Sequence, residues 1–317
     1  MELDKAFLRK FIQSAFSDTV EVIYWDGVKD KYGDGKAKFK IYINGHISKK
    51  NILKDPFLTV GEAYMNNIID FEGNIREIIE SVYRNKDSFL HKAEVFSKIY
   101  KVLPNNIKRS REDIQYHYDL GDDFYSLWLD KTMTYSCGYF MKEEDSLYQA
   151  QINKVNYILK KLQLKPGEKL LDIGCGWGEL IVTAAEKYGV NALGITLSKK
   201  QFEKTNKKIL ENNLQEKVEV RLMDYRELVK EKYKFDRIVS VGMIEHVGRQ
   251  NLSSYMEDVK AMLKEGGISL LHCITAQKEG EVNQWIKKYI FPGGYIPSIR
   301  QLVSLMADND LQKVYIL

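Results

Sequence analysis

The sequence predicts a doubly wound α/β fold, built on one parallel sheet and preceded by a smaller α+β domain. Two observations favour this fold. From residue 169 onward, short apolar runs alternate with amphipathic helical patterns, as in a parallel sheet with right-handed crossovers. In addition, the first apolar run leads into the glycine turn GCGWG at 174–178, and a helical segment, Glu179–Tyr188, follows. A strand, glycine turn and helix start in this order present backbone N–H groups to polar ligand atoms.

The first hundred residues contain no glycine turn of this kind. A helical pattern at 3–16 precedes two strand patterns, Val20–Tyr24 and Phe39–Ile43, and we expect the polar stretch between the strands to be a hairpin connection. The segments 51–57 and 60–65 lead into another amphipathic helical pattern at 75–83, and 88–101 could continue as a helix. We place the domain boundary near Pro104, which gives an α+β domain at 1–103 and a second domain at 104–317.

The second domain is expected to begin with an unusually aromatic segment. Nine residues of 113–140 are Tyr, Phe, Trp or His, and we interpret them partly as a covering layer and partly as the wall of a pocket. A helical pattern then starts at Gln149. The first strand of the sheet is predicted at the apolar run Leu170, Leu171 and Ile173, and the others at 192–197, Val218–Leu222, Phe235–Val241 and 267–274. Ligands of such sheets bind beyond the carboxyl ends of the strands.

Bulk properties exclude several classes of protein. Charged residues make up 29% of the 317 residues and the net charge is +4, which argues against a nucleic-acid binder but permits contact with an anionic membrane. The three cysteines lack metal-ligand spacing and are expected to be reduced, as in a cytoplasmic protein without a metal site. No apolar run approaches the ~20 residues of a membrane span, and the charged N-terminus does not resemble a signal peptide, so we expect only peripheral lipid contact.

The glycine turn resembles motif I of the class I methyltransferases, which bind S-adenosylmethionine on a Rossmann-like sheet. Asp172 lies two residues before the first glycine, and no phosphate-binding Lys-Ser/Thr follows. Many methyltransferases end strand two with an acidic residue that holds the ribose. Thr196 stands there in this chain, so Thr196 and Gln201 are expected to replace the carboxylate with neutral hydrogen bonds. The glycines expected at the cofactor are Gly174, Gly176 and Gly178.

Polar residues also end the later strands. Asp224 closes strand three and is placed either to bind the adenine amino group, with Tyr225 as a stacking surface, or to cap the next helix. Glu245 follows strand four inside an apolar run and is expected to face a polar cavity, because a buried carboxylate without partners is costly. His272 interrupts strand five and, with Cys137, could converge on the same pocket, although a core histidine is the alternative.

Longer motifs identify a resemblance that covers essentially the whole chain. They are DPFLTVGEAYM (55–65), QYHYDLGDDFY (115–125), TYSCGYF (134–140), LDIGCGWG (171–178), GITLSKKQ (194–201), DRIVSVGMIEHVG (236–248), LLHCIT (270–275) and KYIFPGGYIPS (288–298). The chain resembles the cyclopropane-fatty-acyl-phospholipid synthases, relatives of the mycolic acid methyltransferases. The resemblance implies cofactor contacts at Tyr135, Ser136, Gly174, Thr196, Leu197, Gln201, Tyr225 and Arg226.

The resemblance also implies a reaction. A cis double bond in a phospholipid acyl chain attacks the sulfonium methyl of S-adenosylmethionine, aromatic rings stabilise the resulting carbocation, and a bound bicarbonate removes a proton as the ring closes. Bicarbonate is expected at Cys137, Glu245, His272 and the backbone of Ile274, with a supporting role for His117. A homodimer acting on membrane phospholipids at the inner membrane surface is also implied.

The chain differs from this family at its end. Family members continue for several tens of residues, including a tyrosine at the bicarbonate site, whereas this chain stops at Leu317. We therefore expect either a truncated product or an incomplete anion site, with fold and cofactor binding retained. The alternatives are a methyltransferase that modifies its acceptor without ring closure or acts on a small amine, and a non-catalytic partner of a full-length synthase.

Overall fold

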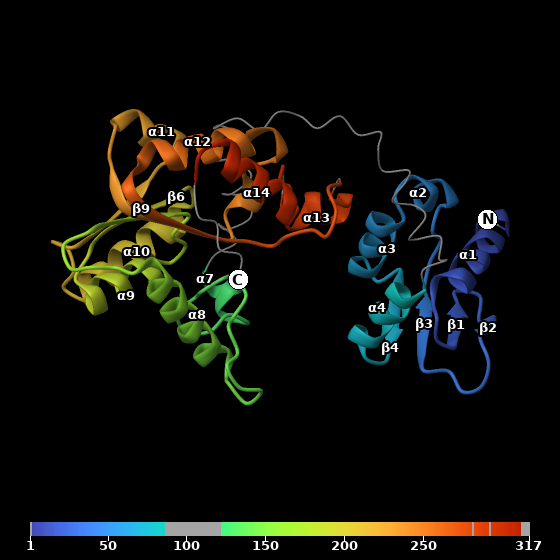
Figure 1. The fold of residues 1–317 in the computed structure, drawn as a ribbon. Coiled ribbons are helices and arrows are strands. Elements are labelled where there is room, and N and C mark those ends of the chain that lie inside the picture. Colours follow the sequence, from blue (N-terminus) through green and yellow to red (C-terminus); the bar gives the residue numbers. More distant parts are fainter. Residues whose placement is uncertain (1, 86–121, 281, 292, 312–317) are drawn as a thin grey trace. The chain divides into compact units, whose positions relative to one another are not determined.

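The structure is a computed structural model that describes residues 2–85, 122–280, 282–291 and 293–311 (Figure 1). The chain divides into two compact units, one assigned to 1–102 with 281–288 and the other to 103–280 with 289–317. Within the described ranges, no helix is both long and apolar enough to cross a bilayer.

The first unit is a four-stranded sheet with helices packed on it, in the strand order β2-β1-β3-β4. Alternate side chains of β1 and β3 are buried and pack with Leu8, Phe11 and Ile12 of helix α1. The elements are α1 (Glu2–Ala15), β1 (Val20–Tyr24), β2 (Lys29–Tyr32), β3 (Phe39–Ile43), α2 (Lys49–Lys54), α3 (Pro56–Met65), β4 (Ile69–Glu72) and α4 (Ile75–Arg84). The predicted helix at 88–101 lies outside the described residues.

The expected hairpin between β1 and β3 is wrong. These strands pair in parallel, with Val22 opposite Ile41, and the antiparallel partner of β1 is β2, which forms from the supposed loop. The sequence of β2 is KDKY, and its side chains alternate between exposed and half-buried. Charged residues of this kind suit an edge strand, and that is the position of β2 in the sheet.

The first unit also includes a segment that is distant in sequence. Helix α13 (Gln284–Tyr289) brings Trp285 against Gly61 of α3, where an added Cβ would lie 2.4 Å from the Trp285 ring. Lys288 forms an ion pair with Glu62, 2.6 Å from Nζ to Oε1. Glycine at position 61 therefore provides the space that the indole occupies.

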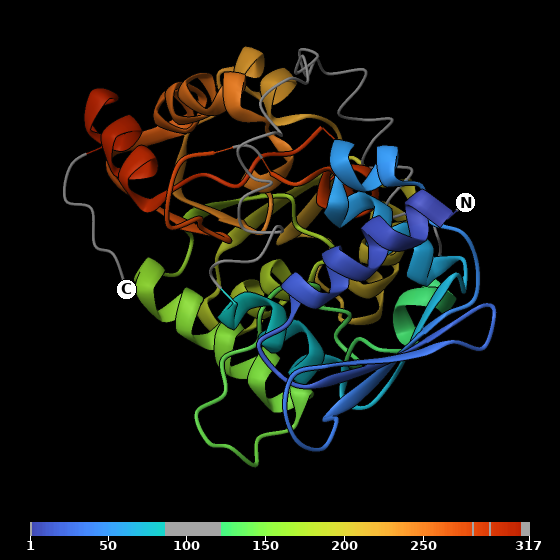
Figure 2. The same cartoon turned by 90° about the vertical axis from the view of Figure 1, so that its right-hand side faces the viewer.

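The second unit confirms the predicted doubly wound fold. Its five strands are parallel throughout and follow the order β7-β6-β5-β8-β9. Helices α8, α9 and α10 lie on one face of the sheet, and α12 with α14 lies on the other (Figures 1 and 2). The elements are α7 (Asp122–Ser126), α8 (Leu147–Leu162), β5 (Lys169–Ile173), α9 (Glu179–Tyr188), β6 (Asn191–Thr196), α10 (Lys199–Glu211), β7 (Val218–Leu222), α11 (Tyr225–Leu228), β8 (Phe235–Val241), α12 (Leu252–Met262), β9 (Leu263–His272) and α14 (Ile299–Asp308), with short 3-10 turns η2 (Val229–Glu231), η3 (Ile244–His246) and η4 (Arg249–Asn251).

The strand order determines where a ligand can bind. From β5 the chain proceeds outward through β6 and β7, then returns to the other side of β5 to form β8 and β9. The connections after β5 and β8 therefore run away from each other and leave a crevice at the carboxyl ends of these two neighbouring strands. The glycine turn that follows β5 lies at this crevice.

Glycine is required in this turn for two reasons. Gly174, Gly176 and Gly178 have φ angles of +84°, +56° and +80°, a region that L-residues with a Cβ adopt only at a cost. At Gly178, which precedes the first residue of α9, an added Cβ would also lie 2.5 Å from Cγ2 of Thr205 on α10. The close contact between the α9 start and α10 depends on the missing side chain.

We expect Gly178→Ala to lower the free energy of unfolding by about 2–4 kcal/mol, because backbone strain and the contact with Thr205 add. Gly167→Ala is a matched control, since its φ is +81° but no atom lies within 4 Å of the added Cβ. It should cost only about 1–2 kcal/mol. Urea denaturation measures both, and equal losses would show that the contact with Thr205 contributes nothing.

Candidate functional site

A pocket opens at the crevice beyond the carboxyl ends of the strands, and all its lining residues belong to the second unit. Its walls come from 132–136, 172–177, 195–197, 223–226 and 241–243, with additional residues from α8, α9, α10 and 246–247. The residues predicted to bind a cofactor that line it are Tyr135, Ser136, Asp172, Gly174, Gly176, Thr196, Leu197, Gln201, Asp224, Tyr225 and Arg226. Gly178 is not among the lining residues, and its place is at the start of α9.

Asp172 presents a buried carboxylate to this pocket. It is 3% exposed, and among the described residues its Oδ1 has no hydrogen-bond partner. Burial raises its pKa from the ordinary value of 3.8 to about 7. A buried carboxylate with an unsatisfied oxygen is costly in a folded protein, so this side chain fits a ligand that brings a cation or a hydrogen-bond donor.

At the end of β6, Thr196 and Gln201, which are predicted to hold a ribose, are hydrogen-bonded to each other. Oγ1 of Thr196 donates to Oε1 of Gln201 at 2.7 Å, and the N–H of Ser198 donates to the same Thr196 oxygen at 3.2 Å. Thr196 and Gln201 are both buried and line the pocket. They fix a polar but uncharged surface on this side of the pocket.

Asp224 has the capping role that the sequence left open. Its side chain accepts from the N–H of Arg226 at 2.9 Å, and the Arg226 guanidinium donates to both carboxylate oxygens, at 2.8 and 2.7 Å. Glu227 accepts from the Asp224 N–H and completes a capping box at the start of α11. An adenine contact would have to use the remaining lone pairs of this carboxylate.

Aromatic rings form one wall of the pocket. The ring of Tyr125, which is 1% exposed, lies 5.3 Å from that of Trp177 and 5.5 Å from that of Tyr135. Trp128 packs edge-on against Tyr135 at 4.9 Å. Tyr135 and Trp177 both line the pocket, so this part of the aromatic segment faces a cavity as predicted.

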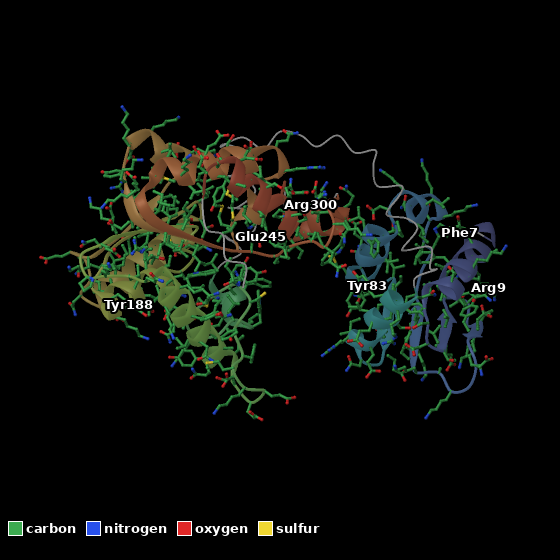
Figure 3. All side chains as sticks on the ribbon, in the orientation of Figure 1. Phe7, Arg9, Tyr83, Tyr188, Glu245 and Arg300 are labelled. Carbon is green, nitrogen blue, oxygen red and sulfur yellow. The ribbon has the colours of Figure 1, made fainter. Side chains whose placement is uncertain are left out.

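Glu245 and His272 lie on neighbouring segments that follow β8 and end β9. The N–H of Gly242 donates to the His272 carbonyl at 2.9 Å, and the N–H of Ile274 donates to Oε1 of Glu245 at 2.7 Å. Glu245, labelled in Figure 3, is 1% exposed. These hydrogen bonds bring the two candidate catalytic side chains to the same edge of the sheet, although neither is among the residues that line the pocket.

Both side chains retain unsatisfied polar atoms. Among the described residues, Oε2 of Glu245 and Nδ1 of His272 are buried and have no hydrogen-bond partner. Burial raises the pKa of Glu245. Burial, together with the charge of Lys154, lowers the pKa of His272 and favours the neutral imidazole. Two kinds of ligand would fit this pair of side chains. One is a proton acceptor, and the other is a ligand with both hydrogen-bond donors and acceptors.

The remaining residues predicted to take part in catalysis are Cys137, Ile274 and His117. Cys137 follows Ser136 in the chain and is an exposed free thiol. The backbone N–H of Ile274, expected to bind an anion, instead donates to Glu245, because the carboxylate lies directly beside it. His117 lies outside the described residues. Among the described residues, no cluster of His, Cys, Asp and Glu could hold a metal ion.

Two residues of α8 that were not predicted from the sequence support the site, and one of them, Lys154, lines the pocket. Gln151 and Lys154 are 3% and 4% exposed. Nε2 of Gln151 donates to the carbonyls of Thr134 and Ser136, at 3.1 and 2.8 Å, and Nζ of Lys154 donates to Oγ of Ser136. They share the buried face of α8 with Val155, so polar residues at core-facing positions were the available signal.

Comparisons with known proteins identify relatives of the chain. A profile of the mycolic acid cyclopropane synthetase family matches residues 105–316, and a family described only as a domain of unknown function matches residues 7–94. The cyclopropane-fatty-acyl-phospholipid synthase of Escherichia coli K12 is 39% identical over 85% of this chain and 70% of its own length. A probable fatty acid methyltransferase of Pseudomonas putida is 35% identical over 80% of this chain and 66% of its own length.

A solved structure shares the fold of the second unit. It is mycolic acid cyclopropane synthase CmaA1 in complex with SAH and CTAB, with a TM-score of 0.58, 36% identity, and coverage of 63% of this chain and 74% of the other. The present chain spans about two thirds of the length of the Pseudomonas putida and Escherichia coli relatives.

We expect Asp172→Asn to stabilise the second unit more at pH 8 than at pH 5. Because the folded-state pKa of Asp172 is raised to about 7, ionisation opposes folding increasingly as the pH rises from about 4 to 7. Asparagine removes this cost, so the gain in free energy of unfolding should be larger at pH 8 by about 2–3 kcal/mol. Urea denaturation at the two pH values measures the difference.

Asp236→Asn is the control of opposite sign. Burial alone would raise the pKa of Asp236. Hydrogen bonds from the Lys264 side chain and the Lys169 N–H outweigh burial and lower this pKa. Its ionised form therefore stabilises the fold above its unfolded pKa, and the substitution should reduce stability at pH 8. A pH-independent effect of Asp172→Asn would contradict the assignment of an ionisable, destabilising carboxylate at position 172.

Proposed function

The chain belongs to the mycolic acid cyclopropane synthetase family, and we propose that it uses S-adenosylmethionine to convert cis double bonds of lipid acyl chains into cyclopropane rings. The observation that carries this proposal is the family match over residues 105–316, which contains every residue that lines the pocket. The relatives are named as a cyclopropane-fatty-acyl-phospholipid synthase and a probable fatty acid methyltransferase, which supports an acyl-chain acceptor.

The pocket has features that fit S-adenosylmethionine. Asp172 supplies a buried carboxylate with an unsatisfied oxygen, and Gly174 and Gly176 line the pocket with backbone that carries no side chain. Thr196 and Gln201 would hold the ribose, and Tyr225 would stack with the adenine. When bound, the cofactor supplies an electrophilic sulfonium methyl group.

The aromatic wall suits a reaction that places positive charge on an apolar acceptor. Tyr135 and Trp177 present rings to the pocket, and Tyr125 and Trp128 pack behind them. The face of such a ring stabilises a desolvated cation by about 2 kcal/mol. The same rings exclude water, which would otherwise react with the cationic acceptor.

Ring closure also requires removal of a proton, and the chain offers Glu245 and His272 near the pocket. Oε2 of Glu245 and Nδ1 of His272 are unsatisfied acceptors or donors that fit an oxyanion such as bicarbonate, which would supply a base when bound. Cys137 and the Ile274 backbone would complete its surroundings. Because the Ile274 N–H donates to Glu245 in this structure, that hydrogen bond would have to be shared or exchanged.

The acceptor is proposed to be a membrane phospholipid, reached from the membrane surface by a protein that associates peripherally, as a homodimer. The name of the Escherichia coli relative supports the phospholipid class.

The defining experiment incubates the 317-residue protein with vesicles of a cis-unsaturated phospholipid, S-adenosylmethionine and bicarbonate. We expect the acyl chains to gain one methylene by mass spectrometry and to show cyclopropane signals in proton NMR. A methyl branch instead of a ring would indicate methylation without ring closure. Unmodified lipid, despite cofactor binding, would contradict the proposed acceptor.

We expect Glu245→Gln to lower turnover by about 100-fold or more, as for loss of a group that acts in proton transfer. The amide oxygen can still accept from the Ile274 N–H, so binding of S-adenosylhomocysteine, measured by calorimetry, should remain unchanged. Glu257→Gln on the exposed side of α12 is the control and should leave turnover unaffected. Full activity of the Glu245 variant would exclude a role in proton removal.

A further inference from the structure

The charged side chains that line the pocket divide into paired and unpaired groups. Asp224 is paired with Arg226 at 2.7 Å, and Glu179 is paired with Lys208 of α10 at 3.0 Å. Asp172 and Lys154 also line the pocket, but neither has an ion-pair partner among the described residues. The pocket therefore presents one carboxylate and one ammonium group that are available to a ligand.

Both unpaired groups are deeply buried. Lys154 is 4% exposed and extends from α8 to donate a hydrogen bond to Ser136 Oγ. Burial lowers its pKa to about 8, against the opposing effects of Cys137 and Asp130. Among the described residues, Lys154 bonds to a neutral hydroxyl and forms no ion pair, so this buried ammonium has lost most of its hydration without a directly bonded counter-charge. An anionic ligand group at this position would supply that counter-charge.

The pocket separates its unpaired charged groups from a neutral surface. The end of β6 offers the neutral pair Thr196 and Gln201, whereas β5 and α8 offer the opposite charges of Asp172 and Lys154. S-adenosylmethionine has the same division, with an uncharged nucleoside at one end and an α-ammonium and α-carboxylate at the other. The two distributions match only if the amino-acid end lies toward β5 and α8.

We propose that Lys154 binds the α-carboxylate of S-adenosylmethionine, opposite Asp172, which faces the α-ammonium. The inference rests on the proposed function, because it takes S-adenosylmethionine as the ligand. Lys154 holds Ser136, a predicted cofactor contact, so the ammonium already lies beside the segment expected to touch the ligand. Gln151, one turn earlier on α8, fixes the backbone of this segment through the carbonyls of Thr134 and Ser136.

A purely structural role for Lys154 makes a different prediction. If Lys154 only held Ser136 in place, its loss would weaken every ligand that touches the 134–136 segment. If it binds the α-carboxylate, its loss would weaken only ligands that carry the amino-acid end. S-adenosylhomocysteine carries that end, and 5′-methylthioadenosine lacks it, so the ratio of their affinities separates the two roles.

The test measures binding of both ligands to the full chain by isothermal titration calorimetry. We expect Lys154→Met to weaken S-adenosylhomocysteine by about tenfold or more, the usual loss for a charge-assisted hydrogen bond, and to leave 5′-methylthioadenosine within about twofold. Lys154→Arg retains the charge and should retain the preference for S-adenosylhomocysteine. Lys160→Met, on the exposed side of α8, is the matched control and should change neither affinity.

The outcomes distinguish this inference from the proposed function. Equal weakening of both ligands by Lys154→Met, or no weakening of either, would overturn the carboxylate assignment while leaving the cofactor in place. Loss of the ligand preference in Lys154→Arg would also overturn it. Failure of the unsubstituted chain to bind S-adenosylhomocysteine at all would overturn the proposed function together with this inference.

Discussion

The site depends on the reversal of strand order at β5. Because β6 and β8 flank β5 on opposite sides, the connections that follow β5 and β8 separate and leave their carboxyl ends uncovered. The glycine turn after β5 and the segment after β8 can then supply polar groups to a crevice, while the apolar side chains of the same strands remain in the core. The sheet thus places Asp172 in the wall of the pocket, and Glu245 buried at the same edge of the sheet, without interrupting its packing.

Burial of charge is the second constraint, and it connects stability with function. Asp172, Glu245 and Lys154 are all nearly inaccessible to solvent. Burial raises the pKa of both carboxyl groups and lowers that of the lysine, so it favours the neutral form of each. Such groups destabilise an empty site, since water is lost before a partner is gained. They also make it selective, because a ligand of complementary charge recovers the lost solvation and a neutral ligand does not.

The sequence predicts the strand pairing of the second unit better than that of the first for a physical reason. Buried parallel strands are continuous apolar runs, and the predicted ranges of β7 and β8 agree with the structure. An alternating strand specifies a buried face but not its partner, so the parallel pairing of β1 with β3 could not be obtained from the pattern. Similarly, α13 is a short amphipathic segment, and nothing in its sequence indicates that it packs against Gly61.

The same reasoning explains which site residues the sequence identifies. Glycines and strand-end polar residues are visible from spacing, whereas Gln151 and Lys154 lie within a helix whose apolar period is satisfied without them. Their hydrogen bonds to the 134–136 segment join two regions that are distant in sequence. Lys154 also lowers the pKa of His272. A carboxylate bound to Lys154, as proposed, would offset this charge, and cofactor occupancy and the proton affinity of His272 would then be coupled through one side chain.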